Sequence, residues 1–115
     1  IDHGVRAIED ASLVAMLAER QIPLGICPTS NLVLGVYASI EQHPVERLRA
    51  AGVRVSINTD DPALLGASLV GEYSLCRKAF NWSDHVTQAV ARTSIEASFA
   101  GPDTKADLLR ALASW

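Results

Sequence analysis

The stretch that most constrains the fold of this chain is residues 53–62. Apolar and polar side chains alternate over residues 53–58, which is the period-2 pattern of a β-strand. Asp60 and Asp61 follow, and Pro62 prevents the strand from continuing because it has no backbone N–H to donate. The sequence therefore predicts a buried strand with two adjacent carboxylates at its C-terminal end.

The acidic pair has two interpretations. Adjacent carboxylates repel each other, so such a pair is typical of a site that holds a cation, a shared proton or a hydrogen-bonded ligand. The C-terminal ends of parallel strands are also where α/β barrels and open α/β sheets place their chemistry. Alternatively, Asp60 and Asp61 accept hydrogen bonds from backbone N–H groups and cap the next helix, which is common for aspartate at turns.

Composition limits the classes of protein to which the chain can belong. A length of 115 residues with 49% hydrophobic residues suits one small globular domain. No apolar run approaches the roughly 20 residues of a membrane helix, and a net charge of −3 gives no support for a nucleic-acid or membrane partner. The two cysteines lie far apart with no secretory leader, which favours free thiols and a cytoplasmic location. The opening residue is not methionine, which suggests a processed, trimmed or partial chain.

Hydrophobic periodicity and helix boundaries predict the elements in order. Residues 1–4 resemble the end of a strand whose beginning is missing. The remaining elements are a helix from Val5 to Arg20, a strand over 22–27, a polar loop over 28–31, a helix from Pro44 to Ala51, the strand 53–58, and helices over 69–80, 83–99 and 105–115.

The alternation of strands and helices predicts parallel strands joined by crossover helices. An open sheet of three parallel strands leaves both edges exposed and needs cover on both faces. A complete (β/α)₈ barrel takes about 250 residues. We therefore expect an α/β fold that forms the C-terminal part of a (β/α)₈ TIM barrel, with about three parallel strands and a helical tail, residues 1–115 being part of one domain. A free-standing small α/β domain is the structural alternative.

The ends of the predicted strands share one property, which is that each is followed by polar or metal-binding side chains. His3, the segment 27–31 and the pair Asp60–Asp61 all follow strands, so parallel strands would bring them to one mouth. A histidine and two carboxylates there can bind a metal, activate water, or both. His43 and His85 make no close-spaced ligand pair and are expected to be structural or exposed, while Cys27 and Cys76 are expected to be buried small hydrophobes.

Three segments resemble successive signatures of the adenosine deaminase family. They are His3-Gly4-Val5-Arg6, Cys27-Pro28-Thr29-Ser30-Asn31 and Asn58-Thr59-Asp60-Asp61-Pro62, and similar features follow at Ser68-Leu69, at Glu72-Tyr73 and over 94–99. The resemblance covers essentially the whole chain. It implies a (β/α)₈ barrel with one zinc ion that hydrolytically deaminates adenosine, giving inosine and ammonia, or deaminates a related 6-aminopurine.

The resemblance also implies roles for three residues. Asp60 matches the zinc ligand that also holds the attacking water, Asp61 matches the aspartate that bonds a purine ring nitrogen, and His3 matches the histidine beside the metal-bound water. The family's three histidine ligands and its proton-donating glutamate have no counterpart in this sequence. The resemblance therefore implies that the chain alone binds zinc weakly and is inactive, unless a missing N-terminal half or another protomer completes the site.

Two other functions stay open at this point. A non-catalytic chain could pair with a second polypeptide through exposed sheet edges and apolar helix faces. A different metal-dependent amidohydrolase could have the same Asp-Asp strand end. The sequence does not choose between adenosine, deoxyadenosine, adenine and a larger purine nucleoside, and it leaves the oligomeric state open.

Overall fold

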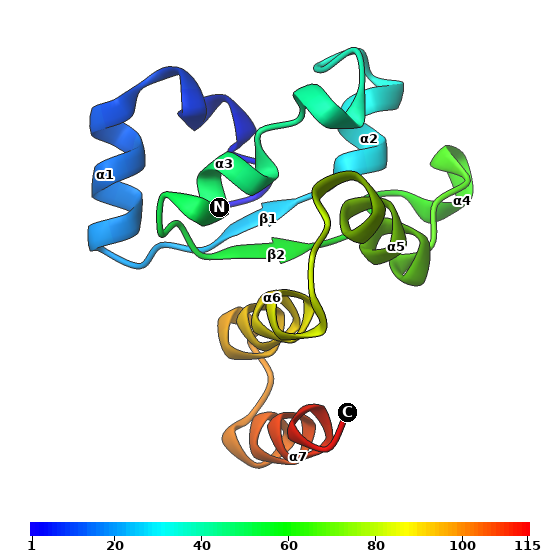
Figure 1. Ribbon diagram of the computed structural model, residues 1–115. Helices are drawn as coiled ribbons and strands as arrows, with labels where there is room; N and C mark the ends of the chain where they lie inside the picture. Colours follow the sequence, from blue (N-terminus) through cyan, green and yellow to red (C-terminus); the bar gives the residue numbers. More distant parts are fainter.

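A computed structural model describes residues 1–115, with two short parallel strands at the centre (Figure 1). They are β1 (Leu24–Ile26) and β2 (Val55–Ile57), paired with Leu24 opposite Val55. A third segment joins beside β1, because Asp2 forms one parallel bridge with Gly25. The Gly25 N–H donates to the Ile1 carbonyl and the His3 N–H donates to the Gly25 carbonyl, both at 2.8 Å. Residues 1–3 thus extend the sheet in the parallel sense, as the sequence predicted.

Both strands are shorter than the alternating patterns indicated. Each has three residues, against the six predicted for 22–27 and for 53–58. The hydrogen bonding nevertheless continues at both ends of β2, because the Leu24 N–H donates to the Arg54 carbonyl and the Asn58 N–H donates to the Ile26 carbonyl, each at 2.9 Å. Pro23 and Pro28 have no N–H to donate, so neither can extend the ladder around β1 as a donor.

The predicted continuous helix from Val5 to Arg20 is wrong, because the chain breaks at Asp10. The first part is a 3₁₀ helix, η1 (Val5–Glu9), and the second is α1 (Ala11–Glu19). Asp10 itself is extended, with φ −127°, and its carboxylate accepts hydrogen bonds from the N–H groups of Ser12 and Leu13. A capping aspartate starts a new helix in this way, which hydrophobic spacing alone did not indicate.

The predicted polar loop over 28–31 is also wrong, because these residues begin α2 (Pro28–Val33). Pro28 suits the first helical position, because an N–H there would have no hydrogen-bond partner within the helix. The N–H of Thr29 donates to Glu72 at 3.0 Å, a tertiary contact that local sequence does not show. The chain then passes through η2 (Ile40–Gln42) to α3 (Val45–Ala50), which lies within the predicted bounds.

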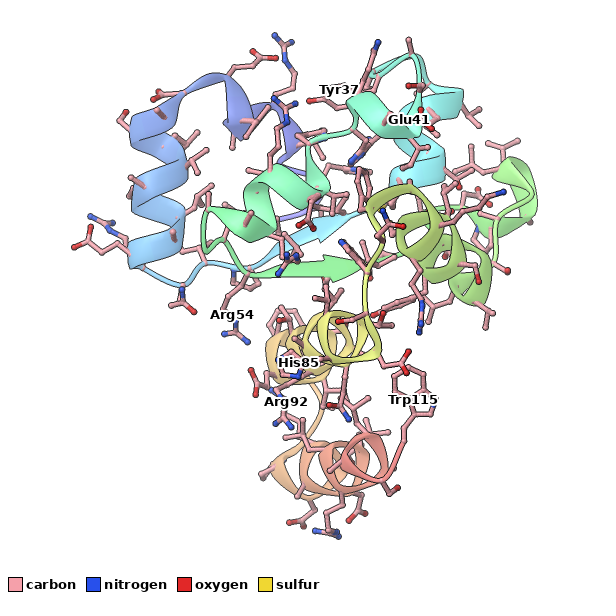
Figure 2. All side chains as sticks on the ribbon, in the orientation of Figure 1. Tyr37, Glu41, Arg54, His85, Arg92 and Trp115 are labelled. Atoms are coloured by element: carbon pink, nitrogen blue, oxygen red, sulfur yellow. The ribbon has the colours of Figure 1, made fainter.

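The last half of the chain is helical, as the sequence predicted. A short helix that was not predicted, α4 (Pro62–Leu65), precedes α5 (Leu69–Phe80), whose bounds are those predicted. Two more helices follow, α6 (Asp84–Ala97) and α7 (Pro102–Ala113). Helix α6 lies against β2, and α7 packs on α6 on the side away from the strands (Figure 1). Arg54 reaches from the start of β2 to Glu96 on α6 with an N–O distance of 2.7 Å (Figure 2).

The buried apolar core lies around the two strands. Its twelve members are Val5, Leu17, Leu24, Ile26, Val45, Leu48, Val53, Val55, Ile57, Cys76, Trp82 and Val90. The core takes residues from both strands and from η1, α1, α3, α5 and α6, but none from α2, α4 or η2. The strands are therefore fixed by close packing on the core. None of the helices combines the length and the apolar character that crossing a lipid bilayer requires.

Candidate metal centre

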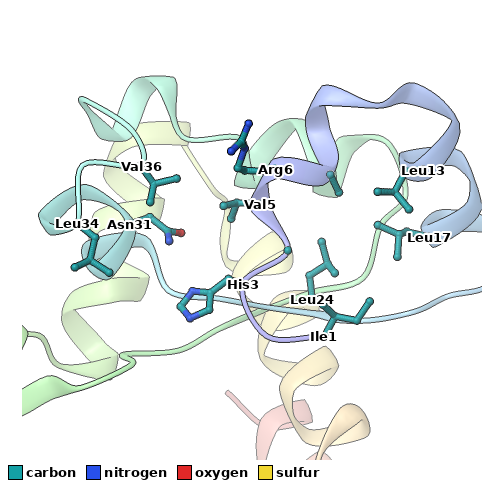
Figure 3. Close-up of a pocket in the computed structure, with 12 residues that line it drawn as sticks. Ile1, His3, Val5, Arg6, Leu13, Leu17, Leu24, Asn31, Leu34 and Val36 are labelled. Atoms are coloured by element: carbon teal, nitrogen blue, oxygen red, sulfur yellow. The ribbon is translucent and has the colours of Figure 1, made fainter.

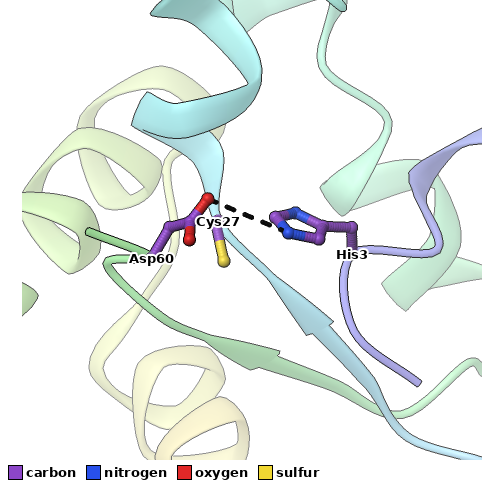
Figure 4. A group of neighbouring side chains, drawn as sticks. All are labelled: His3, Cys27 and Asp60. Atoms are coloured by element: carbon purple, nitrogen blue, oxygen red, sulfur yellow. Dashed lines mark ion pairs between the residues drawn. The ribbon is translucent and has the colours of Figure 1, made fainter. Parts of the chain in front are cut away.

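Three side chains from the ends of three parallel segments meet at one place (Figure 4). His3 follows the bridge at Asp2, Cys27 follows β1, and Asp60 follows β2. One potential ligand atom from each lies within 4.8 Å of the others. The imidazole Nε2 of His3 is 3.9 Å from Oδ2 of Asp60. The structure therefore brings His3 and Asp60 together at the mouth that the strand order predicted.

Both residues of this pair have an unusual backbone conformation. His3 has φ +57° and Asp60 has φ +60°, which is the left-handed region that residues with a side chain rarely adopt. Such a conformation costs on the order of 1–3 kcal/mol, and it persists only where the surrounding structure imposes it. Residues with this conformation are frequent at functional sites. The backbone therefore indicates a functional site at the same place as the cluster of side chains.

The carboxylate of Asp60 is held on one of its two oxygens. The hydroxyl of Ser30, on α2, donates a hydrogen bond to Oδ2 of Asp60 at 2.7 Å, and Ser30 has no exposed surface. Oδ1 of Asp60 makes no hydrogen bond within the chain, and the side chain as a whole is 39% exposed. One oxygen is thus fixed from inside the protein, while the other is free to accept a ligand.

The chemistry of the cluster fits a zinc ion. Imidazole nitrogen, carboxylate oxygen and thiolate sulfur are the ligand atoms that zinc takes in proteins. Nδ1 of His3 is buried and has no hydrogen-bond partner, so the ring has unused bonding capacity. Burial and the charge of Asp60 raise the pKa of the Cys27 thiol to about 11, which keeps that thiol protonated near neutral pH without a metal.

Asp61 points to a different task from Asp60. Its Oδ1 accepts a hydrogen bond from the N–H of Leu64 at 3.0 Å and caps α4. It is not among the three side chains whose ligand atoms meet. The helix-capping interpretation that the sequence left open therefore describes Asp61, whereas Asp60 bonds to Ser30 instead.

The sequence placed the segment 27–31 at this mouth but gave Cys27 and Ser30 no role of their own in the site. Cys27 is buried and free, as predicted for a small hydrophobe, yet its sulfur belongs to the cluster. Ser30 lay in the segment predicted to be a loop and was given no role. The available signal for Cys27 was its place directly after a strand, which it shares with His3. For Ser30, the only signal in the sequence was that it belongs to the polar segment that follows the same strand.

The other histidines are structural or exposed, as the sequence predicted. His43 is buried, and its Nδ1 accepts the N–H of Val45 at 3.2 Å, so Nε2 carries the proton and donates to Asn31 at 3.0 Å. Burial lowers the pKa of His43 to about 4, which keeps the ring neutral near pH 7. His85 is exposed on α6. The pair of His43 and Asn31 fixes the orientation of the Asn31 amide.

An open cavity of about 450 Å³ lies beside the cluster (Figure 3). Three polar side chains, those of His3, Arg6 and Asn31, line it among apolar ones from residues 1–7, α1, β1 and the segment after α2. Apolar walls with a few fixed polar groups are typical of small-molecule sites. His3 therefore belongs both to the cluster and to the wall of the cavity.

Comparison with known proteins agrees with the fold. A family model described as adenosine deaminase matches residues 1–115. Adenine deaminase from Rhizobium leguminosarum bv. trifolii is 47% identical over 112 residues, which are 97% of this chain and 35% of the relative. The crystal structure of adenine deaminase from Arthrobacter aurescens matches with a TM-score of 0.96 and 36% identity over 100% of this chain and 35% of that chain.

A further solved structure is similar and contains a metal. An amidohydrolase from Burkholderia ambifaria, determined with bound Zn, matches with a TM-score of 0.85 and 26% identity over 98% of this chain and 32% of that chain. The fold is that of the C-terminal part of a (β/α)₈ barrel of the metal-dependent amidohydrolase class. Within this class, the chain belongs to the adenosine deaminase family. It spans about a third of the length of the curated relatives that it matches.

Proposed function

We propose that the protein containing this chain catalyses the zinc-dependent hydrolytic deamination of a 6-aminopurine. The observation that carries the proposal is the meeting of His3 and Asp60 at the ends of parallel strands, 3.9 Å apart. Adenine is the substrate we propose first, because two curated relatives at 47% and 49% identity are adenine deaminases. Adenosine and other 6-aminopurine nucleosides are the alternatives. The products from adenine and water are hypoxanthine and ammonia.

Asp60 is the residue that we propose as a zinc ligand. Its Oδ1 is free of hydrogen bonds within the chain, and Oδ2 is anchored by Ser30. When bound, zinc supplies Lewis acidity that makes hydroxide available near neutral pH. A catalytic zinc ordinarily needs three or more protein ligands. We propose that the further ligands and the proton donor come from outside residues 1–115, in the same polypeptide or in a second one.

His3 and Asp61 are proposed to act on water and on the purine, respectively. The Nε2 of His3 faces Asp60 and the His3 side chain is 41% exposed, so the ring can hold and orient an attacking water molecule beside that carboxylate. Asp61 uses Oδ1 to cap α4, which leaves Oδ2 available to a purine ring nitrogen. A hydrogen bond to an acceptor nitrogen requires that the Asp61 carboxyl be protonated, or that the ring nitrogen be protonated instead.

The cytoplasmic location also stays a prediction of the sequence. It is supported by Cys27 and Cys76, which are both free and buried in the structure. A reducing compartment keeps such thiols unpaired.

The experiment that tests the function is a deamination assay on the complete natural protein loaded with zinc. Release of ammonia is measured with adenine, adenosine and adenosine monophosphate as separate substrates. We expect adenine to give the highest kcat/KM. A zinc-loaded protein that turns over no 6-aminopurine would contradict the proposal and favour a different barrel hydrolase or a non-catalytic chain. Faster turnover of adenosine than of adenine would support the proposed reaction but show that adenosine is the preferred substrate.

A non-catalytic role is the second candidate, and exposed apolar surface favours it. Val33 and Leu34 at the end of α2 are 61% and 68% exposed, and Val70 on α5 is 78% exposed. Such side chains are typical of surfaces that another polypeptide covers. The deamination assay separates the two candidates, because a purely structural chain would leave the complete protein inactive even with zinc bound.

A further inference from the structure

The hydroxyl of Ser30 makes the only hydrogen bond that the Asp60 carboxylate receives within the chain. The Oγ of Ser30 lies 2.7 Å from Oδ2 of Asp60. Ser30 is completely buried, whereas the Asp60 side chain is 39% exposed. A hydrogen bond to a charged acceptor is stronger than one between neutral groups. The contact therefore joins a fixed, buried donor to a carboxylate that is otherwise half in solvent.

The position of Ser30 is itself fixed by its neighbours on both sides. The N–H of Thr29 donates to the buried carboxylate of Glu72 on α5 at 3.0 Å. The side chain of Asn31 bonds to the buried ring of His43 at 3.0 Å. Contacts from two separate parts of the chain thus hold the first turn of α2, and the hydroxyl of Ser30 is held with it.

Asp60, by contrast, lies in a turn that offers it little other support. Its φ is +60°, a conformation that costs free energy for a residue with a side chain. Its neighbour Asp61 is exposed and bonds to α4. Without the contact to Ser30, the Asp60 carboxylate would be free to populate several rotamers, and binding a metal would then require ordering it again.

We propose that Ser30 is a positioning residue, whose hydroxyl holds one oxygen of Asp60 so that the other is ready to bind zinc. The proposal rests on the proposed function, in which Asp60 is a zinc ligand. Residues that bond to a metal ligand in this way typically change metal affinity by about 10- to 100-fold when they are removed. The acceptor of this hydrogen bond is an oxygen of Asp60, the proposed zinc ligand. Loss of the Ser30 hydroxyl should therefore lower the affinity for zinc more than it lowers the stability of the fold.

The test is the zinc dissociation constant of the complete natural protein, measured by competition with a chromophoric chelator. Wild type is compared with Ser30→Ala and with Ser30→Thr, which keeps a hydroxyl. The matched control is Ser56→Ala, because Ser56 is a nearly buried serine on β2 whose hydroxyl lies 3.4 Å from the Leu24 carbonyl and does not touch Asp60. The unfolding midpoint of each zinc-free variant checks that it folds.

We expect Ser30→Ala to raise the zinc dissociation constant by about 10- to 100-fold, while Ser30→Thr and Ser56→Ala stay within about threefold of wild type. The zinc-free unfolding midpoints of the two alanine variants should be similar. An unchanged dissociation constant in Ser30→Ala would overturn the proposal. Equal weakening in the alanine and threonine variants would also overturn it, because packing and not the hydroxyl would then be responsible. A wild-type protein that neither binds zinc nor deaminates purines would contradict the proposed function instead.

Discussion

The imidazole of His3 faces the carboxylate of Asp60 across 3.9 Å, although the two residues lie near opposite ends of the strand-forming half of the chain. Each follows a parallel segment of the same sheet, and each has a left-handed backbone conformation. Parallel pairing brings the C-terminal ends of strands to one edge. The relationship is therefore a direct consequence of the topology.

Replacing His3 by glutamine separates a role in the reaction from a role in holding the metal. We expect kcat to fall by about 10²- to 10⁴-fold, the range typical of a lost general acid or base, while zinc content stays that of wild type. Zinc is measured by atomic absorption and kcat by release of ammonia. If His3→Gln also lost its zinc, His3 would be a ligand, as the proximity of its ring to Asp60 and Cys27 permits.

Two substitutions of Asp61 separate its helix cap from its proposed contact with the purine. Asparagine caps helices about as well as aspartate, so Asp61→Asn should leave the free energy of unfolding unchanged, whereas Asp61→Ala should lose about 1 kcal/mol. Both variants should retain zinc. Asp61→Ala should lose most turnover, whereas Asp61→Asn, whose amide can accept from Leu64 and donate to the purine, should lose less. An Asp61→Ala enzyme with wild-type kcat/KM would mean that Asp61 serves only as the cap of α4.

Glu72 holds the first turn of α2 and so supports the site without being part of it. Its replacement should lower the free energy of unfolding. Its buried carboxylate accepts the N–H of Thr29 at 3.0 Å, so Glu72→Ala leaves a donor unsatisfied and should destabilise the protein by about 1–3 kcal/mol. Glu72→Gln keeps an acceptor oxygen and should cost less. Urea unfolding measures both, and Glu41→Ala is the control because Glu41 is exposed (Figure 2). A Glu72→Ala protein as stable as Glu41→Ala would contradict this.

His43 should make the protein less stable as the pH falls. Burial lowers the pKa of His43 from 6.5 to about 4, so below pH 6.5 the unfolded chain binds a proton that the folded chain does not. The contribution of neutral His43 to the free energy of unfolding is complete above about pH 6.5. It declines toward pH 4, by about 3 kcal/mol in total. Urea unfolding between pH 7 and pH 4 should show this loss in wild type and in His85→Gln. It should be reduced in His43→Gln, and an equal pH dependence in all three would contradict the assignment.

Much of the fold was predictable because its signals are local. The alternation over residues 53–58 and the two adjacent aspartates located β2 and its C-terminal end, and the hydrophobic spacing of α5 gave its bounds. The helix α2 was not predictable in the same way. Its first N–H is satisfied by Glu72, which lies far along the chain, and only tertiary structure brings the two together.

The candidate site was predictable in part for the same reason. His3 and Asp60 follow strands, and the order of the strands was enough to expect that they meet. The contact of Ser30 with Asp60 depends on the orientation of α2, which no periodicity indicated. For Asp61, the turn alone suited a cap or a ligand, the family resemblance implied contact with a purine ring nitrogen, and the structure shows the cap.

The central claim is that Asp60 binds zinc in a 6-aminopurine deaminase, and metal analysis of the Asp60→Ala variant tests it most directly. The complete natural protein, the variant and Asp61→Ala as its neighbour control are purified in the same buffer, and zinc content and adenine turnover are measured on each. We predict that Asp60→Ala loses zinc and activity together, whereas Asp61→Ala keeps its zinc. An Asp60→Ala protein that is loaded with zinc and active would contradict the account.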